Sequence, residues 1–479
     1  MSAKHSTNPW LVLVLICMAQ FMVVLDATIV NVALPHIKLA LGFTNANLQW
    51  IINAYTLVFA GFLLLGGRAG DLLGRKRLFL VGLVIFTTAS LLNGLAGSSG
   101  MLIGFRALQG LGAALISPAA LSIISTTFAE GKERARALGV WAAIAIGGSA
   151  FGLVLGGWLT QSFSWRWIFF VNVPVGILAF LAALRIVPES KDEHAHQGYD
   201  LGGAVTVTGG LMVLVYALVT GQSHGWASAT TIGGFLAAAV LLAVFVVFEL
   251  RSAEPLVRLS IFRVRSLLTA NLAMFLAFSG MFAMFYFNTL YIQEVLGFHP
   301  LKAGLSFLPF TAGIMLSAGL ASNLAPRIGV RPVAVVGMLL SIAGMLLFAR
   351  MPLGGSYAAD VLPGMIVSSL GMGAIFMPLT LMATTGLEDE DQGLASGLFN
   401  TSQQVGGALG LAILTTIAAS REHGSFTPPA LVHGGHYGFA GAACFVAGGL
   451  VVVLALLRKH HVARIQAAAA EGEPVAVGG

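Results

Sequence analysis

Residues 67–77 read GRAGDLLGRKR, a short polar turn between two long apolar segments, and a related stretch, APRIGVRP, recurs at residues 325–332. Each stretch places a glycine, Gly74 or Gly329, beside basic residues. Glycine permits close helix approach and backbone angles that other residues avoid. Two related turns so far apart in the chain predict a protein built from two similar halves.

A second pair of segments supports this repeat. Aligning the two turns also pairs Gly82 with Gly337, and farther along Gly110–Gly112 (GLG) resembles Gly371–Gly373 (GMG). Chance similarity between glycine-rich apolar helices is the alternative explanation for either match taken alone. Internal repeats are common in secondary transporters, in which the substrate site lies between the halves.

The composition excludes a soluble protein. Of 479 residues, 57% are apolar and 9% are charged, whereas a soluble domain carries about 25% charged residues. So few charges cannot cover a soluble fold of this size, which excludes an ordinary cytosolic enzyme, a nucleic-acid-binding protein and a disordered chain. The formal net charge of +6 is explained by the basic residues that hold membrane proteins in orientation.

Fourteen apolar segments are long enough to span a bilayer, which takes about 20 residues. These segments are 11–33, 48–66, 78–97, 101–127, 137–159, 167–187, 201–220, 229–250, 266–292, 303–325, 332–349, 358–382, 395–419 and 437–457. Their continuous apolar character excludes a β-barrel, whose strands are short and alternate. The first segment is too long for the core of a signal peptide, so we expect it to remain as a helix.

Lys and Arg predict the orientation in the membrane. With the N-terminus in the cytoplasm, most Lys and Arg residues outside the spans fall on the cytoplasmic side. We therefore expect a multi-pass protein of the cell (cytoplasmic) membrane with both termini in the cytoplasm.

The repeat and the spans together predict an all-α membrane protein of two six-helix bundles plus an inserted central helix pair. The bundles are expected at 11–190 and 266–458, and the two-helix linker at 200–250. Short cytoplasmic segments, 1–10 and 459–479, flank them.

Two charged residues lie deep inside predicted spans. Asp26 lies about seven residues, or ~10 Å, from the outer end of the first span, and Arg106 lies about five residues, or ~8 Å, inside the fourth. A charged side chain at this depth is costly, so each should face a cavity or a partner. The matching depths predict a direct or water-bridged pair, and we expect protonation of Asp26 to release Arg106 and switch the conformation. The alternative is a buried carboxylate that only bridges helices.

The 67–77 turn contains candidates for a conformational switch, namely Gly67, Asp71, Gly74 and Arg75. The Asp71 carboxylate can accept hydrogen bonds from Arg75 or from a facing helix end and so form a latch. The alternative is a simple basic anchor at the membrane surface.

Three glycines at four-residue spacing, Gly148, Gly152 and Gly156, lie on one face of the fifth span. This spacing lets another helix pack closely. The face can serve for packing alone or as a sliding surface during a conformational change.

A phenylalanine stripe at helical spacing, 275–285, marks the ninth span and could bind flat apolar or cationic compounds. A lipid-facing or helix-packing stripe is the alternative, and single polar residues in spans can instead form interhelical hydrogen bonds. The predicted substrate-cavity residues are Asn31, Asn53, Tyr55, Gln109, Phe282, Phe285 and Asn288.

No cofactor, metal site or ATP-driven step is predicted. His433 and His436 lack a nearby carboxylate or cysteine, and no GxxxxGK[ST] phosphate-binding loop occurs in the chain. A membrane-bound enzyme is disfavoured because no intramembrane cluster of His, Asp or Glu could bind a metal or act as an acid–base pair. The expected partners are protons, a small organic substrate and the lipid bilayer, with no nucleic acid and no ATPase domain.

Four motifs give the chain a family resemblance. They are LDATIVNVALP at 25–35, the 67–77 turn, RALQGLG at 106–112 and WRWIF at 165–169 with Asn172 and Pro174. Together they resemble the fourteen-helix drug:proton antiporter family of the major facilitator superfamily. The resemblance implies the major facilitator fold, the proton gradient as energy source, a role for Arg106 in proton transfer, and multidrug or antibiotic efflux by alternating access.

One motif departs from the family pattern. The family's fifth helix carries Gly-Pro-x-x-Gly-Gly, whereas residues 152–157 read GLVLGG with Leu153 in place of the proline. The kink that the proline would introduce is therefore absent, and the consequence for coupling stays open. The functional alternatives are a dedicated exporter of one endogenous metabolite and a non-transporting membrane sensor, and the sequence names neither substrate, proton stoichiometry nor oligomeric state.

Overall fold

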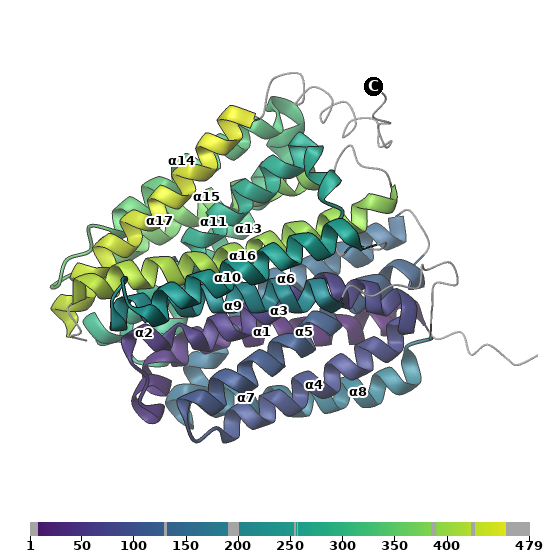
Figure 1. Cartoon of the computed structure of the whole chain (residues 1–479), viewed down its shortest axis with the longest axis horizontal. Coiled ribbons are helices and arrows are strands. Elements are labelled where there is room, and N and C mark those ends of the chain that lie inside the picture. The colour runs from purple at the N-terminus through teal and green to yellow at the C-terminus, as the bar shows by residue number, and fades with distance from the viewer. Residues whose placement is uncertain are drawn as a thin grey trace, which may run out of the picture. The chain divides into compact units, whose positions relative to one another are not determined.

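The computed structural model describes residues 8–128, 132–189, 201–252, 255, 257–384, 389–422 and 427–456. Within these residues every regular element is a helix (Figure 1). The helices are α1 (Pro9–Leu41), α2 (Asn45–Leu48), α3 (Trp50–Leu73), α4 (Arg75–Leu95), α5 (Ser99–Thr127), α6 (Lys132–Ser162), α7 (Trp167–Phe170), α8 (Asn172–Ile186), α9 (Leu201–His224), α10 (Ala229–Arg251), α11 (Arg265–Leu290), α12 (Pro300–Leu305), α13 (Leu308–Ile328), α14 (Val330–Phe348), α15 (Leu362–Thr384), α16 (Asp389–Glu422) and α17 (Pro428–Leu456). A 3-10 helix, Leu259–Arg263, and two π-helical turns, Tyr291–Val295 and Tyr357–Val361, complete the set.

Most of these helices can cross a membrane. In the described part of the chain, 11 helical segments are long and apolar enough to do so. The other three predicted spans also lie in helices: α3, whose apolar part is Trp50–Leu63, α6 and α16. Fourteen membrane crossings stay a prediction.

The chain divides into two compact units. Unit 1 contains the described parts of Met1–Phe43, Trp50–Thr208 and Val244–Leu256, and unit 2 contains those of Thr44–Gln49, Gly209–Ala243 and Val257–Gly479. The divisions at Thr208 and Ala243 fall inside α9 and α10, the helices of the predicted linker.

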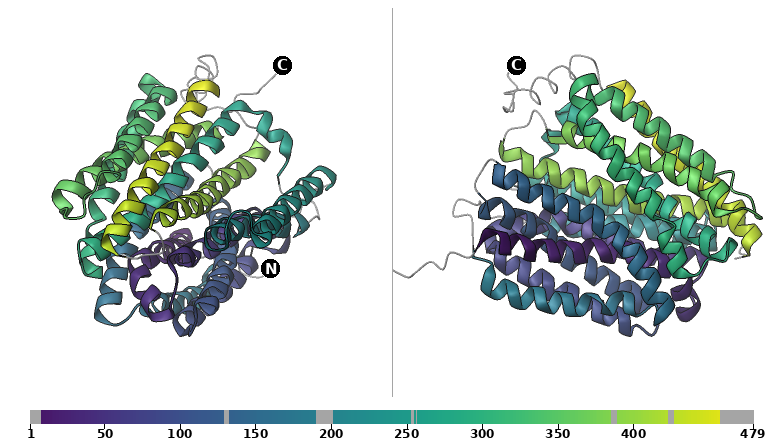
Figure 2. Two further views of the ribbon diagram at one scale, coloured as in Figure 1. Left: turned by 60° about the vertical axis from the view of Figure 1, so that its left-hand side comes forward. Right: turned by 180° about the vertical axis from the view of Figure 1, so that it is seen from behind.

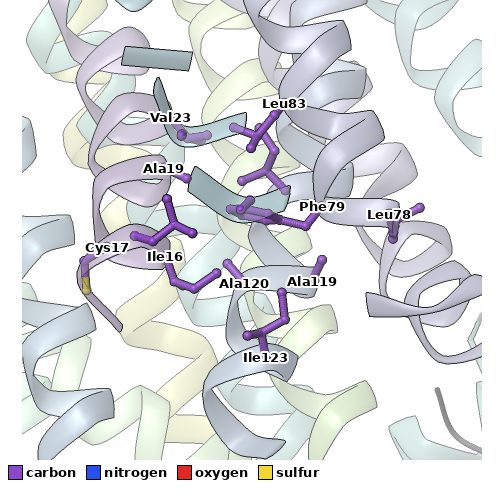
Figure 3. Close-up of a cluster of buried hydrophobic side chains, with 14 of the residues drawn as sticks. Ile16, Cys17, Ala19, Val23, Leu78, Phe79, Leu83, Ala119, Ala120 and Ile123 are labelled. Atoms are coloured by element: carbon purple, nitrogen blue, oxygen red, sulfur yellow. The ribbon is translucent and has the colours of Figure 1, made fainter. Parts of the chain in front are cut away.

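In unit 1, α5 packs against both α3 and α4, and α1 packs against α6. An apolar core joins α1, α4 and α5 (Figure 3). Its labelled members are Ile16, Cys17, Ala19, Val23, Leu78, Phe79, Leu83, Ala119, Ala120 and Ile123. Within this core α5 packs against both α1 and α4, and its small residues Ala119 and Ala120 allow the close packing typical of membrane helices.

Unit 2 repeats these packing relationships with later helices. Here α15 packs against α13 and α14, and α11 packs against α16 (Figures 1 and 2). The α3–α5–α4 group and the α1–α6 pair of unit 1 therefore have counterparts in the α13–α15–α14 group and the α11–α16 pair.

The two related turns have the same backbone conformation. Gly74 precedes α4 with φ 104° and ψ 131°, and Gly329 precedes α14 with φ 99° and ψ 151°. A residue with a side chain rarely adopts this region, so both positions require glycine. The repeat expected from the sequence is thus present at the turns.

The second alignment needs a correction of two residues. A methyl group on Gly82 would lie 3.1 Å from the Gly112 carbonyl oxygen, and one on Gly337 would lie 2.9 Å from the Gly371 carbonyl oxygen. The counterpart of Gly112 is therefore Gly371, whereas the sequence alignment paired it with Gly373. The packing of α4 on α5 and of α14 on α15 determines the register, while Gly373 contacts α13 instead.

Candidate functional site

The two charged residues singled out by depth form an ion pair inside unit 1. Arg106 Nη1, on α5, donates a hydrogen bond of 2.5 Å to Asp26 Oδ2, on α1. The Asp26 and Arg106 side chains are 0% and 1% exposed. The predicted direct pairing is therefore confirmed, and the pair is sealed within the unit.

The second oxygen of the Asp26 carboxylate also has partners. Gln109 Nε2 donates to Oδ1 at 2.8 Å and Asn172 Nδ2 donates to the same atom at 2.9 Å. A buried ion is tolerated only when its charge is paired and its remaining lone pairs are hydrogen-bonded. The surroundings of Asp26 meet both conditions for the ionised form.

Arg106 is oriented by α3 as well as by Asp26. Its Nε donates to the Ile51 carbonyl at 3.0 Å, and its Nη1 also donates to Gln109 Oε1 at 2.8 Å. The guanidinium carbon lies 4.4 Å from the centre of the Tyr55 ring, a cation–π contact. The guanidinium thus has defined partners on three helices.

Further polar groups extend the cluster. Asn93 Nδ2, on α4, donates to Gln109 Oε1 at 2.7 Å. Asn172 Nδ2 also lies 3.1 Å from Ser90 Oγ, and Ser90 in turn donates to the Phe169 carbonyl at 2.9 Å. One hydrogen-bonded network therefore connects α1, α3, α4, α5, α7 and α8, all within unit 1.

The predicted glycine face of the fifth span lies directly against the helix that carries Asp26. A methyl group on Gly152 would lie 3.0 Å from the Leu25 carbonyl oxygen, and one on Gly156 would lie 2.7 Å from that of Ile29. Gly148 is looser, since its methyl group would lie 3.2 Å from the Phe21 ring. α6 therefore contacts the α1 backbone on both sides of Asp26.

The missing family proline leaves this helix continuous. α6 runs from Lys132 to Ser162 without a break at Leu153, which is buried. Flexibility in this helix must come from its glycines, because no position lacks the backbone donor that a proline would remove.

The predicted 67–77 turn is shorter in the structure, because residues 67–73 belong to α3 and residues 75–77 to α4, which leaves Gly74 as the turn. The start of α4 is held to α8 and the segment after it. Lys76 Nζ donates to the Leu184 carbonyl at 2.9 Å, and Arg77 Nε lies 3.6 Å from Glu189 Oε2. A methyl group on Gly74 would lie 2.6 Å from Glu189 Oε1. The side chain of Asp71 lies outside the described part of the chain, so its role as a latch, with Gly67 and Arg75, stays a prediction.

The predicted cavity residues of unit 1 fall into two groups. Tyr55 and Gln109 belong to the Asp26 network described above. Asn31 is buried and donates to the Thr28 carbonyl of its own helix at 3.1 Å, and Asn53 is fully buried on α3. Gln109 was expected to line a substrate cavity, and the structure places it at the ion pair.

The predicted cavity residues of unit 2 lie along α11. The Phe285 ring stacks on Phe307, with 5.5 Å between ring centres. The Phe282 ring packs against Gly407, where a methyl group would lie 2.7 Å from it. Asn288 is fully buried and donates to the Met284 carbonyl at 3.0 Å. A pocket elsewhere in this unit, lined by α11, α14 and α17, includes none of these predicted residues.

Three network residues, Ser90, Asn93 and Asn172, were absent from the predicted site. The depth rule that paired Asp26 with Arg106 would have found all three, because Ser90 lies seven residues, or ~10 Å, from the end of the span 78–97, which is the depth of Asp26. Asn93 lies four residues, or ~6 Å, from the end of the span 78–97, and Asn172 lies five residues, or ~8 Å, inside the span 167–187. Both depths match that of Arg106.

The described residues contain no group of three or more His, Cys, Asp or Glu side chains arranged to hold a metal ion. His436 Nε2 instead lies 2.8 Å from the Met351 carbonyl oxygen. The polar chemistry of the site is therefore that of one carboxylate, one guanidinium and neutral amides and hydroxyls.

Comparison with known proteins gives a consistent result. Residues 16–411 match the Major Facilitator Superfamily. The chain is 39% identical over 456 residues to the puromycin resistance protein pur8 of Streptomyces alboniger, covering 93% of this chain and 90% of that protein.

Two further relatives carry similar names. The cephamycin export protein CmcT of Amycolatopsis lactamdurans is 40% identical, with 91% of this chain and 90% of that protein covered. The lincomycin resistance protein of Streptomyces lincolnensis is 37% identical, with 96% and 94% covered.

Solved structures show the same fold at low identity. A crystal structure of the peptide transporter POT gives a TM-score of 0.67 at 16% identity, covering 95% of each chain. A bacterial homolog of the human lysosomal transporter Spinster gives 0.61 at 16% identity, covering 92% of this chain and 95% of that one. These likenesses show the architecture alone.

Proposed function

The chain belongs to the Major Facilitator Superfamily, and we propose that it exports hydrophobic drugs, antibiotics or similar organic compounds in exchange for protons. It is a multi-pass transporter of the cell membrane rather than an enzyme. Alternating access carries the substrate outward as protons move inward down their gradient. The proposal requires no cofactor.

The single observation that carries proton coupling is the sealed Asp26–Arg106 ion pair. Neutralising the carboxylate removes the charge that holds the guanidinium, and a buried Arg106 without its counter-ion is unstable in place. A proton arriving from outside therefore switches unit 1 between two arrangements. Loss of the proton to the cytoplasm restores the pair.

Close packing of α6 on α1 supports this switch. Gly152 and Gly156 contact the α1 backbone one turn apart around Asp26, so a movement of α1 must be matched by α6. With Gly148 they form a surface along which the helices can slide. Gly67, Asp71, Gly74 and Arg75 would hold or release the turn between α3 and α4 during the same movement.

Fourteen membrane crossings with both termini in the cytoplasm are part of the proposal. The distribution of Lys and Arg supports this orientation. It corresponds to six-helix bundles at 11–190 and 266–458 with an inserted pair at 200–250. Reporter fusions after successive helices test the count, because each crossing reverses the side on which the reporter is found.

The substrate class is supported by the relatives and by the phenylalanine stripe of the ninth span, 275–285. Relatives are named for puromycin, cephamycin and lincomycin, which differ widely in chemistry. The expected substrate-contact residues are Asn31, Asn53, Tyr55, Gln109, Phe282, Phe285 and Asn288. A dedicated exporter of one endogenous metabolite is the second candidate, because these three relatives are each named for a single compound.

Proteoliposomes with an imposed proton gradient test the coupling. Puromycin, lincomycin and a panel of other apolar drugs are added, and proton movement and drug accumulation are followed together. We expect drug-dependent proton release with the wild-type protein and loss of proton-driven accumulation with Asp26→Asn. Asp360→Asn is the matched control, because this carboxylate belongs to unit 2, where it accepts a hydrogen bond from the Ser356 backbone N–H.

Two results would contradict this function. Full proton-driven accumulation by Asp26→Asn would remove Asp26 from the coupling. Absence of proton release with every compound of the panel would argue against drug:proton exchange, and activity with one compound alone would favour the dedicated exporter.

A further inference from the structure

The amides beside the ion pair have a single hydrogen-bonding direction. Gln109 donates from Nε2 to Asp26 Oδ1, and its Oε1 accepts from both Arg106 Nη1 and Asn93 Nδ2. A carboxylate can only accept and a guanidinium can only donate. The orientation of Gln109 is therefore dictated by the two charges, and Gln109 in turn dictates that Asn93 donates.

This hydrogen-bonding direction leaves one atom of the Gln109–Asn93 branch, Asn93 Oδ1, without a partner. Asn93 Oδ1 is buried and has no hydrogen-bond partner, and the Asn93 side chain is 0% exposed. A buried polar atom without a partner is costly, and its presence in a folded protein calls for a reason. An inverted amide chain would satisfy this oxygen.

Protonation of Asp26 permits that inversion. A proton on Oδ1 turns the acceptor into an O–H donor, which requires an acceptor where Gln109 Nε2 now lies. If the Gln109 amide turns over, its Oε1 accepts from the carboxyl group and its Nε2 faces Asn93. If Asn93 also turns over, its Oδ1 accepts from Gln109 Nε2, and its Nδ2 takes the unpartnered place that Oδ1 holds with ionised Asp26.

The same inversion acts on Arg106. In the present arrangement Gln109 Oε1 accepts from Arg106 Nη1. After inversion an N–H group of Gln109 would face the N–H groups of the guanidinium. Two donors cannot bond to each other, so Arg106 loses a second partner at the moment when Asp26 loses its charge.

We propose that Asn93 is a positioning residue that stabilises the protonated state of Asp26 by accepting a hydrogen bond from the inverted amide of Gln109. Asn93 acts through Gln109, to which its side chain is hydrogen-bonded, and not on the Asp26 carboxyl group directly. The inference deepens the proposed function and rests on it, because it explains how one proton releases Arg106.

The other branch of the network lacks this property. Asn172 Nδ2 donates to Asp26 Oδ1 and Ser90 Oγ, and Ser90 donates to the Phe169 carbonyl. Asn172 can keep donating to a protonated carboxyl group, which retains acceptor lone pairs. Inversion is therefore needed only on the Gln109–Asn93 side.

Few other titratable groups act on Asp26 among the described residues. Arg106 on α5 and Tyr55 on α3 are the ones that interact electrostatically with it. The residues that α4 and α8 bring to the network, Ser90, Asn93 and Asn172, do not titrate, and α6 contributes glycines. A change at Asn93 can therefore be read through the titration of Asp26 itself.

The test is infrared titration of the full-length protein in liposomes, without any substrate. The carboxyl band that appears on acidification and is missing in Asp26→Asn reports protonation of Asp26. In Asn93→Leu, which has similar volume and no acceptor, the inverted Gln109 donor has no partner. We expect the titration midpoint of the Asp26 carboxyl band in Asn93→Leu to move by about one pH unit or more to lower pH, because an unpaired buried donor disfavours the protonated state of Asp26.

The matched control makes the same substitution at another buried asparagine. Asn271, on α11 in unit 2, accepts from Ser402 Oγ at 2.7 Å and donates to the Leu267 carbonyl at 2.8 Å. Asn271→Leu removes two hydrogen bonds far along the chain from this network and should leave the Asp26 midpoint at the wild-type value. A shift equal to that of Asn93→Leu would attribute the effect to general loosening and overturn the proposal.

A second measurement does not depend on the folding of Asn93→Leu. Wild-type protein with isotope-labelled asparagine side-chain carbonyls should show a shifted asparagine band whenever the Asp26 carboxyl band appears, because Asn93 Oδ1 gains a hydrogen bond. The spectrum of Asp26→Asn should lack both changes. An unchanged asparagine band, or an unshifted midpoint in Asn93→Leu, overturns the role of Asn93 alone, whereas proton-driven transport by Asp26→Asn overturns the proposed function.

Discussion

Asp26 Oδ2 and Arg106 Nη1 lie 2.5 Å apart although 80 residues separate them in the chain, and neither side chain reaches the surface. Helices α1 and α5 bring the two charges together at the same depth. A pair sealed in this way is sensitive to loss of either partner, because the remaining charge has no water to stabilise it.

Removing one member of the pair should destabilise the protein more than removing both. Arg106→Met leaves the Asp26 carboxylate buried and uncompensated, and we expect a loss of about 3–5 kcal/mol in unfolding free energy. Asp26→Leu combined with Arg106→Met should lose less than the sum of the single changes. Denaturation of the four proteins in detergent gives this double-mutant cycle, and strict additivity would contradict the pairing.

The glycines of α6 should differ in their tolerance of a methyl group. Gly156→Ala places the new carbon 2.7 Å from the Ile29 carbonyl oxygen, which belongs to the backbone and cannot move aside. Overpacking of this kind costs about 1–3 kcal/mol. Gly148→Ala is the control, because its nearest neighbour is the Phe21 side chain at 3.2 Å. The melting temperature should fall clearly for Gly156→Ala and little for Gly148→Ala, and the reverse order would exclude close packing of α6 on α1.

Both turn glycines should be intolerant of a side chain. Gly74→Ala and Gly329→Ala force alanine into φ near 100°, at a cost of about 1–3 kcal/mol each. Gly97→Ala is the control, because the backbone at Gly97 does not have a positive φ and nothing lies within 4 Å of the new methyl group. Thermal denaturation should separate the two turn variants from the control, and wild-type stability of either turn variant would refute the required backbone conformation.

Arg166 should stabilise the end of α4. Its Nη1 donates to the Gly94 carbonyl at 2.9 Å and to the Ala96 carbonyl at 2.7 Å, where a helix leaves carbonyl groups without partners. We expect Arg166→Gln to lower the unfolding free energy by about 1 kcal/mol, since it removes charged hydrogen bonds to these carbonyls. Arg166→Lys keeps the charge and should recover part of the loss. Equal stability of all three proteins would show that the bonds contribute nothing.

Much of the fold followed from local sequence properties. An apolar run of about 20 residues is stable in hydrocarbon only as a helix, because its backbone groups must bond within the segment. The predicted spans are accordingly helical, although 167–187 is divided between α7 and α8 and 303–325 between α12 and α13. The turn glycines Gly74 and Gly329 were also identified correctly, since a positive φ is a local requirement.

Other features depended on packing between distant segments. The counterpart of Gly112 was placed at Gly373 and lies at Gly371, because the crossing point of two helices, and not residue identity, determines which glycine is needed. Gln109 was expected at a substrate cavity, and in the structure it forms hydrogen bonds to both Asp26 and Arg106. A polar residue in a span can serve either purpose, and its own helix does not distinguish them.

The sequence by itself determined that this protein crosses the membrane many times, that it repeats an internal unit, and that Asp26 and Arg106 lie at one depth. These properties depend on hydropathy, on repeated motifs and on the constant rise of a helix, which can be counted along one chain. Only the tertiary structure decided that Ser90, Asn93, Gln109 and Asn172 gather around the ion pair. A buried charge has to satisfy its hydrogen bonds with whatever donors the neighbouring helices present, and those neighbours exist only in the folded protein.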